Sequence, residues 1–332
     1  MDINATHREA IIVDGVAPLL QRQKYVDLYK AGGVTCVAPT LSTTENAADA
    51  FRAAAGWLGF IDRRPDLLHV RTVDDIARAK REDRLGILFH FQGTSPFEQD
   101  LDLVAAFEAV GVRMAMLTYN TRNYVGDGCE EESDAGLSRF GRKLIEALNR
   151  TGITVDLTHT GKRTTMEAME VSTKPVVFSH SNAKALLDVQ RNIDDEQARA
   201  AARTGGLVAV TLAPYFITVG RKPTIDDFVD HLAHFANLVG CDHVGIGLDY
   251  YWGQQPFASD QEADDLWSEF VAAGIWDPAT YPRPPHYYPD SLATPAELSG
   301  LTAALDRRGF SEVEILKILG ANWLRVFRDT WR

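Results

Sequence analysis

The sequence is poor in cysteine. Its 332 residues include three cysteines, Cys36, Cys129 and Cys241, an odd number at wide spacing. No Cys-x-x-Cys pair is present, so the spacing indicates neither a thiolate zinc site nor a disulfide framework. A chain of this length buries enough surface on folding to need no covalent cross-links. We therefore expect three reduced thiols in a cytoplasmic protein.

Long apolar runs and an excess of positive charge are also missing. No stretch reaches the roughly eighteen consecutive apolar residues that indicate a membrane-spanning helix. The first residues, MDINATHREAIIVDG, contain no basic segment followed by an apolar one, so we expect no signal peptide. The formal net charge of -12 at pH 7 works against nucleic acid as a partner, because phosphate binding requires Lys and Arg.

Short apolar, β-branched runs recur along the chain and are separated by helical patterns. Most of them are nearly continuous in apolar residues, which is typical of parallel strands buried on both faces. The overall composition, 45% hydrophobic and 24% charged, is that of a globular protein without a disordered tail. The eight predicted strands comprise residues 10–16, 34–39, 86–91, 114–119, 153–158, 175–180, 207–212 and 243–248.

Amphipathic stretches lie between the predicted strands. Ser138 can cap one helix, and Thr224 with Asp227 resembles the capping box of another, which Gly240 ends. The length alone would suggest two domains, but eight strand–helix alternations predict a single (β/α)₈ TIM-like barrel over residues 1–332, followed by C-terminal helices. A doubly wound open sheet is the weaker alternative, because no Gly-rich phosphate loop is present.

One irregular segment, residues 250–293, follows the predicted eighth strand and is rich in Trp and Pro. Loops after the strands of a barrel border the active site, so we expect this segment to form a lid. The alternative is a surface excursion packed by its own aromatic side chains. Three helices are predicted to close the chain, over residues 294–306, 311–319 and 321–328.

Polar side chains stand at the C-terminal ends of several predicted strands, where barrel enzymes place their catalytic groups. Two histidines on neighbouring strands and a facing carboxylate can hold a divalent metal, and imidazole nitrogens suit zinc. A single histidine in such a place is more often structural, so the hypothesis depends on the whole set. The set is His90, Gln92, Tyr119, Asn120, His159, His180 and Asp249.

Two further histidines, and His90 of this set, have other interpretations. His231 and His234 are spaced i, i+3 on a predicted helix, but Phe228 and Leu232 define its buried face, so we expect the two histidines to be exposed to solvent. His90 lies on the same strand face as Gln92 and could reach a metal. The favoured interpretation is a barrel-interior histidine hydrogen-bonded to a neighbour.

The segments around the polar set resemble the membrane (renal) dipeptidase family. The resemblance rests on VDLTH ending at His159, VVFSHSN around His180, QRN at Arg191 and HVGIGLD ending at Asp249. GVRMAMLTYN, GLSRFGRKLIEALNRTGI and GANWLRVF add to it, so that it covers nearly the whole chain in order. It implies a zinc-dependent (β/α)₈ enzyme of the amidohydrolase type that cleaves dipeptides, including dipeptides with a D-residue at the C-terminal side.

The resemblance also implies roles for individual residues. His159 and His180 match the two histidines that bind one zinc in such enzymes. Asp249 matches the carboxylate that binds the other zinc and moves a proton between the attacking water and the leaving amine. Arg191 matches the arginine that holds the substrate carboxylate, a task suited to its planar fork of donors.

The first strand departs from the family pattern. The family's DGHxD motif, whose His and Asp bind the second zinc, is replaced here by DGVAP, with Val16 and Pro18 at the ligand positions. Gln92 stands where a glutamate bridges the two metals, and a neutral amide is a poor bridge between cations. Tyr119 stands where a histidine steadies the tetrahedral intermediate. The sequence is closest to a bacterial branch that lacks the same first-strand ligands.

These residues together predict a hydrolase of a dipeptide or small carboxylate-bearing amide that uses one zinc ion per chain. The zinc would be held by His159 and His180 and completed by Gln92 or Asp249. Asp249 would take and return the proton, Tyr119 and Asn120 would donate hydrogen bonds to the oxyanion, and Arg191 would anchor a carboxylate.

Two alternatives stay open. A lyase or isomerase acting on a small carboxylate could use the same groups, and an inactive dipeptidase-like binding protein would fit the lost ligands. The number of subunits is also open, a homodimer being one option.

Overall fold

Nine parallel strands, eight of them in a ring, form the centre of the molecule. The computed structural model describes residues 2–331. The strands follow the order β1-β2-β4-β5-β6-β7-β8-β9, and β3 pairs with the outer part of β4. Their bounds are β1 Val13–Ala17, β2 Cys36–Ser42, β3 Leu67–Val70, β4 Leu85–Phe91, β5 Val112–Met116, β6 Thr154–Asp156, β7 Val176–Phe178, β8 Leu207–Val210 and β9 Val244–Ile246.

The last strand returns to the first and nearly closes the ring. Leu248 N donates a hydrogen bond of 2.7 Å to Asp14 Oδ1, and Asp249 N donates one of 3.3 Å to Val16 O. The predicted (β/α)₈ barrel is therefore confirmed, and each of the eight predicted strands overlaps one strand of the ring. β3 is not among the predicted strands; it is four residues long and contains the polar His69.

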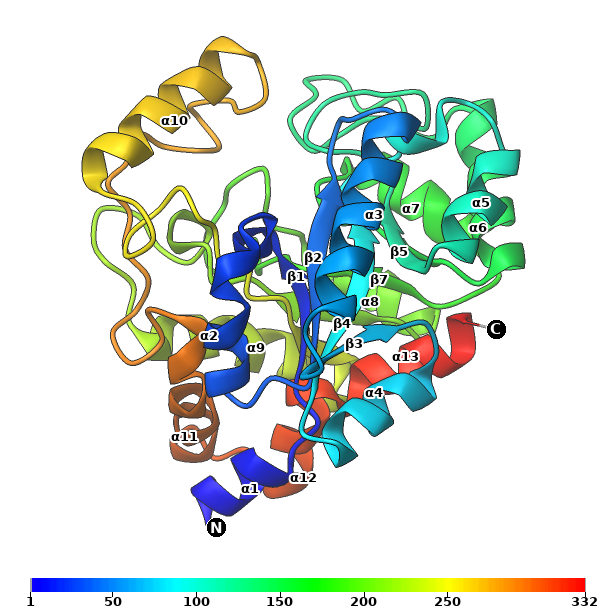
Figure 1. The fold of residues 1–332 in the computed structure, drawn as a ribbon. Helices are drawn as coiled ribbons and strands as arrows, with labels where there is room; N and C mark the ends of the chain where they lie inside the picture. Colours follow the sequence, from blue (N-terminus) through cyan, green and yellow to red (C-terminus); the bar gives the residue numbers. More distant parts are fainter. Residues whose placement is uncertain (1, 332) are drawn as a thin grey trace.

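Helices surround the ring and cover its outer face (Figure 1). Those between strands are α2 Val26–Ala31, α3 Ala47–Asp62, α4 Val73–Arg81, α5 Asp102–Ala109, α6 Arg139–Thr151, α7 Lys162–Val171, α8 Asp195–Arg203 and α9 Ile225–Val239. The others are α1 Ile3–Glu9, α10 Asp260–Ala272, α11 Ser299–Arg307, α12 Glu312–Leu316 and α13 Asn322–Thr330, with a π-helical turn at Lys317–Ala321. Short 3₁₀ segments are Pro18–Gln21, Gln23–Tyr25, Ser95–Phe97, Pro214–Phe216, Cys241–His243 and Pro295–Glu297.

The predicted helix boundaries follow from capping side chains. Ser138 Oγ accepts a hydrogen bond of 2.9 Å from Gly141 N at the start of α6. Thr224 and Asp227 form a reciprocal capping box at the start of α9, and Gly240 ends that helix. Satisfying the free N–H groups of a first turn in this way stabilises a helix by about 1 kcal/mol.

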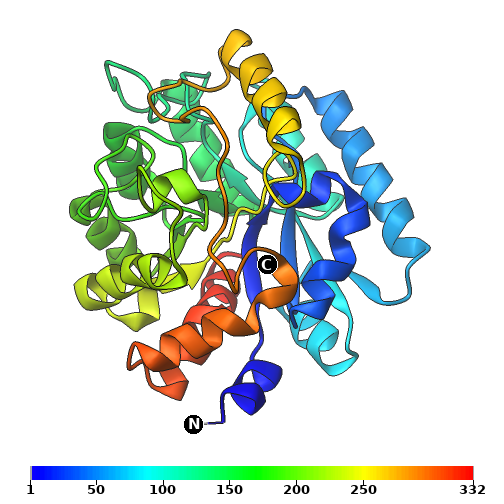
Figure 2. The same cartoon turned by 90° about the vertical axis from the view of Figure 1, so that its left-hand side faces the viewer.

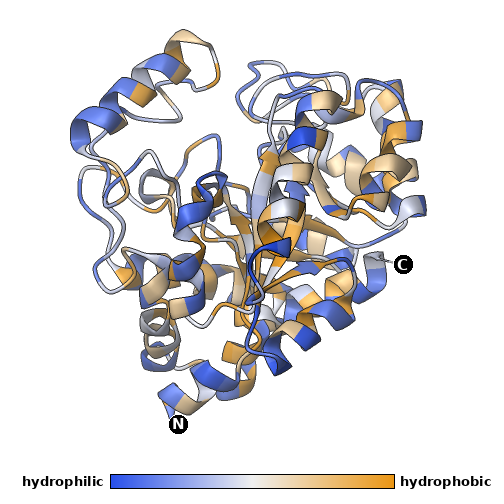
Figure 3. Cartoon of the chain, in the orientation of Figure 1, coloured by the Kyte–Doolittle hydropathy of each residue, from blue (hydrophilic) through white to orange (hydrophobic). Residues whose placement is uncertain are grey.

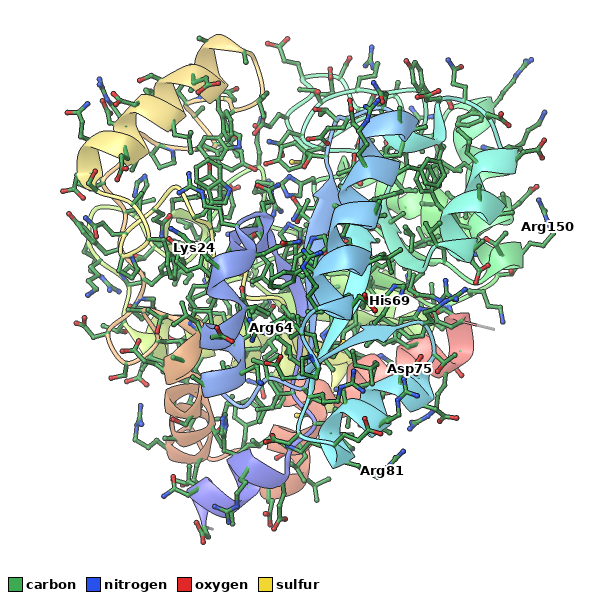
Figure 4. All side chains as sticks on the ribbon, viewed as in Figure 1. Lys24, Arg64, His69, Asp75, Arg81 and Arg150 are labelled. Carbon is green, nitrogen blue, oxygen red and sulfur yellow. The ribbon has the colours of Figure 1, made fainter. Side chains whose placement is uncertain are left out.

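The central strands are largely apolar, and most charged side chains lie on the outside of the molecule. Figure 3 shows hydrophobic residues concentrated on the central strands, and the labelled Arg81 and Arg150 extend from the edge of the molecule in Figure 4. At one end the interior is sealed by Trp323 of α13, whose indole donates to Ile246 O at 3.0 Å. A Cβ atom on Gly15 would lie only 2.3 Å from the Trp323 ring, so only glycine fits there.

The part of the lid segment, residues 250–293, that surrounds α10 stands at the opposite end of the barrel from α1, and the rest runs down the side of the barrel toward α11 (Figures 1 and 2). It carries α10, the helix shown in gold at the top of Figure 2. Among residues 2–331 no helix is both long enough and apolar enough to cross a lipid bilayer.

The expectation that His231 is exposed to solvent is wrong. His231 is 1% exposed, not solvent-facing: its Nδ1 accepts a hydrogen bond of 3.1 Å from Ala183 N, and its Nε2 lies 3.3 Å from Ile217 O. The imidazole thus bridges two loops next to α9. An amphipathic pattern cannot predict that a histidine is buried against loops, because the pattern treats histidine as a polar, exposed residue.

Candidate functional site

A cavity of about 240 Å³ opens at the C-terminal ends of the barrel strands. Gln92, Tyr119, His159 and Asp249 of the predicted set line it. The lid segment supplies a second wall through Tyr251, Phe270, Ile275, Trp276 and Tyr281, so the prediction that this segment borders the site is confirmed. A larger hollow of about 470 Å³, between residues 214–223 and 282–287, contains none of the predicted site residues.

Three of the predicted residues adopt the left-handed backbone conformation. The φ angles are 59° at Asn120, 62° at His159 and 58° at Asp249, and each residue follows a strand of the ring. Such a conformation is costly for a residue with a side chain and concentrates at functional sites. At these three positions it turns the chain sharply where the strand ends.

His159 and His180 face one another inside the protein. Their Nε2 atoms are 3.0 Å apart, and the two side chains are almost fully buried. His159 Nδ1 lies 2.5 Å from Asn120 Oδ1, and His180 Nδ1 lies 2.7 Å from Ser179 Oγ. The Ser179 hydroxyl donates its proton to Asp156, so it accepts from His180.

The hydrogen-bond partners therefore place the ring proton of each histidine on Nδ1. The amide orientation of Asn120 is set because its Nδ2 donates to Ile275 O at 3.3 Å, which leaves Oδ1 to accept from His159. Burial keeps the pKa of both histidines well below the usual value, and the positive charge of Arg191 acts in the same direction. Two uncharged nitrogens thus direct lone pairs toward the same space, an arrangement suited to a bound cation.

Asp156 is not among the predicted site residues, but it supports the histidine pair through Ser179. Its Oδ2 accepts from Ser179 Oγ at 2.5 Å, and its Oδ1 accepts from the backbone N of Ser179 and of Thr158, both at 3.0 Å. Burial acts to raise the pKa of Asp156, but the nearby imidazoles of His90 and His180 and the hydrogen bond from Ser179 outweigh it and hold that pKa below the usual value. Asp156 is therefore an ionised carboxylate that orients His180 through Ser179.

His90 belongs to the same buried cluster. Its Nε2 lies 3.3 Å from Asp156 Oδ2, and neither side chain is exposed. Neither ring nitrogen of His90 has a hydrogen-bond partner among residues 2–331. The predicted interior position of His90 is therefore confirmed, whereas the predicted hydrogen bond to a neighbour is not found.

Asp249 and Gln92 present polar groups to the cavity that the fold itself leaves unpaired. Burial raises the pKa of Asp249 to about 7, although the nearby Arg191 works to lower it. Gln92 is 5% exposed, and its Nε2 has no hydrogen-bond partner within residues 2–331. Both groups are thus available to a ligand.

Tyr119 and Asn120 use their side chains differently. The Tyr119 ring stacks on His159 with 4.3 Å between centroids, its hydroxyl accepts from Trp276 Nε1 at 3.2 Å, and burial raises its pKa to about 12. Tyr119 therefore keeps its proton and can donate it in a hydrogen bond. Asn120 is fully buried, its amide is engaged by His159, Ile275 and Tyr281, and it is not among the residues that line the cavity.

Arg191 lies behind the histidine pair. Its side chain is buried, its guanidinium stands 5.0 Å from the Phe216 ring centroid, and its Nη2 donates to His180 O at 3.2 Å. Nε has no partner among the described residues 2–331. Arg191 faces a second hollow of about 200 Å³ and not the main cavity, and His159 lines both.

A metal would find two protein donors already in place. The paired Nε2 atoms of His159 and His180 fit a divalent cation that accepts imidazole. Within residues 2–331, however, no group of three or more His, Cys, Asp and Glu side chains is arranged to hold a metal ion. The remaining ligands would have to come from the Gln92 amide, from a movement of Asp249 or from water.

Glu130, on the loop after β5, makes the lid contact sensitive to pH. Burial raises the pKa of Glu130 to about 7, the charge of Asp277 on the lid adds to this, and Arg191 opposes it. The protonated form is thus favoured when the lid is packed. Its contribution is fully present below about pH 4.5, the ordinary pKa of glutamate, and is lost as the pH rises through about 7.

We expect amide hydrogen exchange in residues 275–281, corrected for the intrinsic rate, to accelerate severalfold between about pH 6 and pH 8. The Glu130→Gln variant, which keeps the neutral form, should hold the slower exchange at both pH values. The same acceleration in wild type and in Glu130→Gln would show that another group controls the lid.

Comparison with known proteins supports the fold and identifies the family. The model of the membrane dipeptidase family, peptidase family M19, matches residues 60–269. A crystal structure of an amidohydrolase from Pseudomonas aeruginosa superimposes with a TM-score of 0.88 and 32% identity over 100% of this chain and 99% of that one. A metallo peptidase from Rhodobacter sphaeroides, bound to a phosphinate mimic of L-Ala-D-Ala, shares the fold at 21% identity and a TM-score of 0.79, over 97% of this chain and 100% of that one.

Curated relatives are longer than this chain. The dipeptidase tcpJ of Claviceps purpurea is 29% identical over 77% of this chain and 53% of its own length. An uncharacterized dipeptidase of Schizosaccharomyces pombe, C3A11.10c, is 33% identical over 69% of this chain and 49% of its own length. The chain thus spans about half the length of the curated relatives it matches. Because the family model covers well over half of the chain, and motifs at His159, His180 and Asp249 lie in one site, the chain belongs to the membrane dipeptidase family, peptidase family M19.

Proposed function

We propose that this protein is a mononuclear metallohydrolase of a dipeptide or small carboxylate-bearing amide, with zinc as the metal. The observation that carries the proposal is the convergence of two uncharged imidazole nitrogens, 3.0 Å apart, at the cavity that Asp249 also lines. A buried pair of nitrogen lone pairs repels unless a cation lies between or beside them.

The ligand set of this proposal is His159 and His180, completed by Gln92 or Asp249. When bound, the metal supplies a Lewis acid that lowers the pKa of a water molecule. Val16 and Pro18 stand in β1 and directly after it, and neither has a side chain able to bind a second metal. One metal per chain is consistent with the neutral Gln92 at the position where a second ion would need an anion.

Asp249 would act as the general base and then as the general acid. Its carboxylate lines the cavity and has a pKa of about 7, near the value that lets one group accept and return a proton at neutral pH. It would take the proton from the attacking water and give it to the leaving nitrogen. The proton then leaves with the amine product, and the carboxylate is regenerated.

The remaining residues would bind and orient. The Tyr119 hydroxyl keeps its proton and can donate a hydrogen bond to the oxygen on which negative charge develops. Gln92 Nε2, which has no partner within residues 2–331, offers a second donor. Asn120 would position His159 and not touch the substrate, which revises its expected role. Arg191 would attract the substrate carboxylate from the hollow behind His159.

The test is the metal content of protein purified without added metal, measured by elemental mass spectrometry, combined with a dipeptide panel assayed for free amine. About one zinc per chain and amine release from part of the panel, including pairs with a C-terminal D-residue, would support the proposal. Turnover of an amide-free carboxylate without amine release would indicate a lyase or isomerase. If the protein takes up no metal when zinc is supplied and releases no amine, hydrolysis is contradicted, and the inactive binding protein is the remaining alternative.

A further inference from the structure

The charges around the main cavity are all of one sign. Its lining includes the carboxylates of Glu45 and Asp249 and, within the described residues 2–331, no lysine or arginine. Arg191 is separated from it and faces the second hollow behind His159. The two hollows therefore differ in charge: Arg191 lines the one behind His159, and the acidic side chains of Glu45 and Asp249 line the main cavity.

Aromatic faces make up much of the same lining. They are Tyr119, Tyr215, Phe216, Tyr251, Phe270, Trp276 and Tyr281. Trp276 organises this wall: it stacks on Tyr281 with 4.8 Å between centroids and meets the rings of Phe270 and Tyr251 edge to face at 4.8 and 5.8 Å. Aromatic faces attract cations through the negative potential of the ring, and most strongly where water is excluded.

Glu45 lines the same cavity as this wall, and its carboxylate is held by three hydrogen bonds. It follows β2 and precedes α3, and its Oε2 accepts from Thr43 N at 2.6 Å, Ser42 Oγ at 3.0 Å and Thr44 N at 3.1 Å. Its other oxygen, Oε1, accepts no hydrogen bond from residues 2–331. The turn needs an acceptor at this position but not a charge, because a glutamine oxygen could accept the same three bonds.

We propose that the cavity selects a ligand carrying a compact cationic group, an ammonium or methylated ammonium, which lies against the Trp276 wall and pairs with Glu45. The idea deepens the proposed function by naming the substrate class: a small amide with the cationic group on the side of the lid and a carboxylate on the side of Arg191. Binding of the cation itself requires no turnover and no metal, so it can be tested independently of hydrolysis.

The direct test compares choline with 3,3-dimethylbutan-1-ol, a neutral molecule of the same shape, by isothermal titration calorimetry. We expect choline to bind at least about fivefold more tightly, since cation–aromatic and cation–carboxylate attraction is lost in the neutral probe. The Glu45→Gln variant should reduce that preference severalfold. Phe270→Leu, which removes one aromatic face and keeps an apolar side chain, should reduce it to a smaller extent.

Glu146→Gln on the exposed face of α6 serves as the control and should leave the preference unchanged. Equal affinities for the two probes, tighter binding of the neutral one, or no binding of either would overturn the proposal. An unchanged preference in Glu45→Gln would overturn the assignment of Glu45.

The cationic group could be the amino terminus of a dipeptide or a side chain, and cleavage of matched dipeptides separates these sources. Lysyl-D-alanine carries both groups, norleucyl-D-alanine only the amino terminus, and Nα-acetyl-lysyl-D-alanine only the side chain. If Glu45→Gln lowers kcat/KM for norleucyl-D-alanine but not for Nα-acetyl-lysyl-D-alanine, the cationic group is the amino terminus. If it lowers kcat/KM for Nα-acetyl-lysyl-D-alanine but not for norleucyl-D-alanine, the cationic group is the side chain. Choline binding without cleavage of any of the three would contradict the hydrolase while sustaining the cation site.

Discussion

Replacing Asp249 by Asn should lower kcat/KM for a cleaved dipeptide by about 10²–10⁴-fold and leave the metal in place. Asn keeps the volume and the left-handed backbone of Asp249, whose φ is 58°, but it cannot accept a proton. The loss should fall mainly on kcat, because the group acts in proton transfer and not in holding the substrate carboxylate. Steady-state kinetics together with the metal content of the same preparation measure both effects.

The matched control is Asp62→Asn, an exposed aspartate at the end of α3 whose substitution should leave kcat/KM unchanged. Loss of metal along with activity in Asp249→Asn would identify Asp249 chiefly as a ligand. Full activity with Asn at this position would contradict its role as the proton-transferring group.

Removing either imidazole of the facing pair should abolish metal binding. In His180→Ala or His159→Ala, one of the two nitrogens that now stand 3.0 Å apart is lost, and the other cannot hold a divalent ion against buffer. The expected metal content falls from about one to nearly zero per chain, and amine release disappears with it. Elemental mass spectrometry and the amine assay, each on protein shown by circular dichroism to be folded, measure the two.

His234→Ala tests whether the effect is specific to the pair. His234 is half-buried on α9 and pairs with Asp195 at 2.7 Å, away from the site, so its loss should not change the metal content. Metal retained in both His159→Ala and His180→Ala would place the ion elsewhere. Two metals per chain in the wild type would mean that other side chains replace the missing ligands of β1.

The barrel could be predicted from the sequence because its strands are buried on both faces and read as continuous apolar runs. β3 escaped this signal because it lies off the ring, pairs only with β4 and includes His69. His231 was placed wrongly because a polar residue on a helix face can still be buried when loops supply partners, here Ala183 and Ile217.

The residues of the site were predicted from their position at strand ends, but their partners were not. Asp156 lies inside the motif that ends at His159, and a carboxylate within a buried strand was an available signal. The Trp276 wall could not be predicted, because it depends on how residues 250–293 fold back over the barrel. The sequence predicts Asn120 as a substrate contact, whereas in the structure its amide is engaged by His159 and Ile275.

The left-handed turns at Asn120, His159 and Asp249 bear on whether the site is still under functional constraint. Each such turn costs a residue with a side chain about 1 kcal/mol or more relative to glycine, so the three together are a considerable fraction of a domain's net stability. Glycine would relieve the backbone cost at any of the three, but it would also remove the side chain that the turn presents. The three turns therefore spend backbone stability on presenting Asn, His and Asp at the ends of the barrel strands, where Asn120 orients His159 and Asp249 lines the cavity.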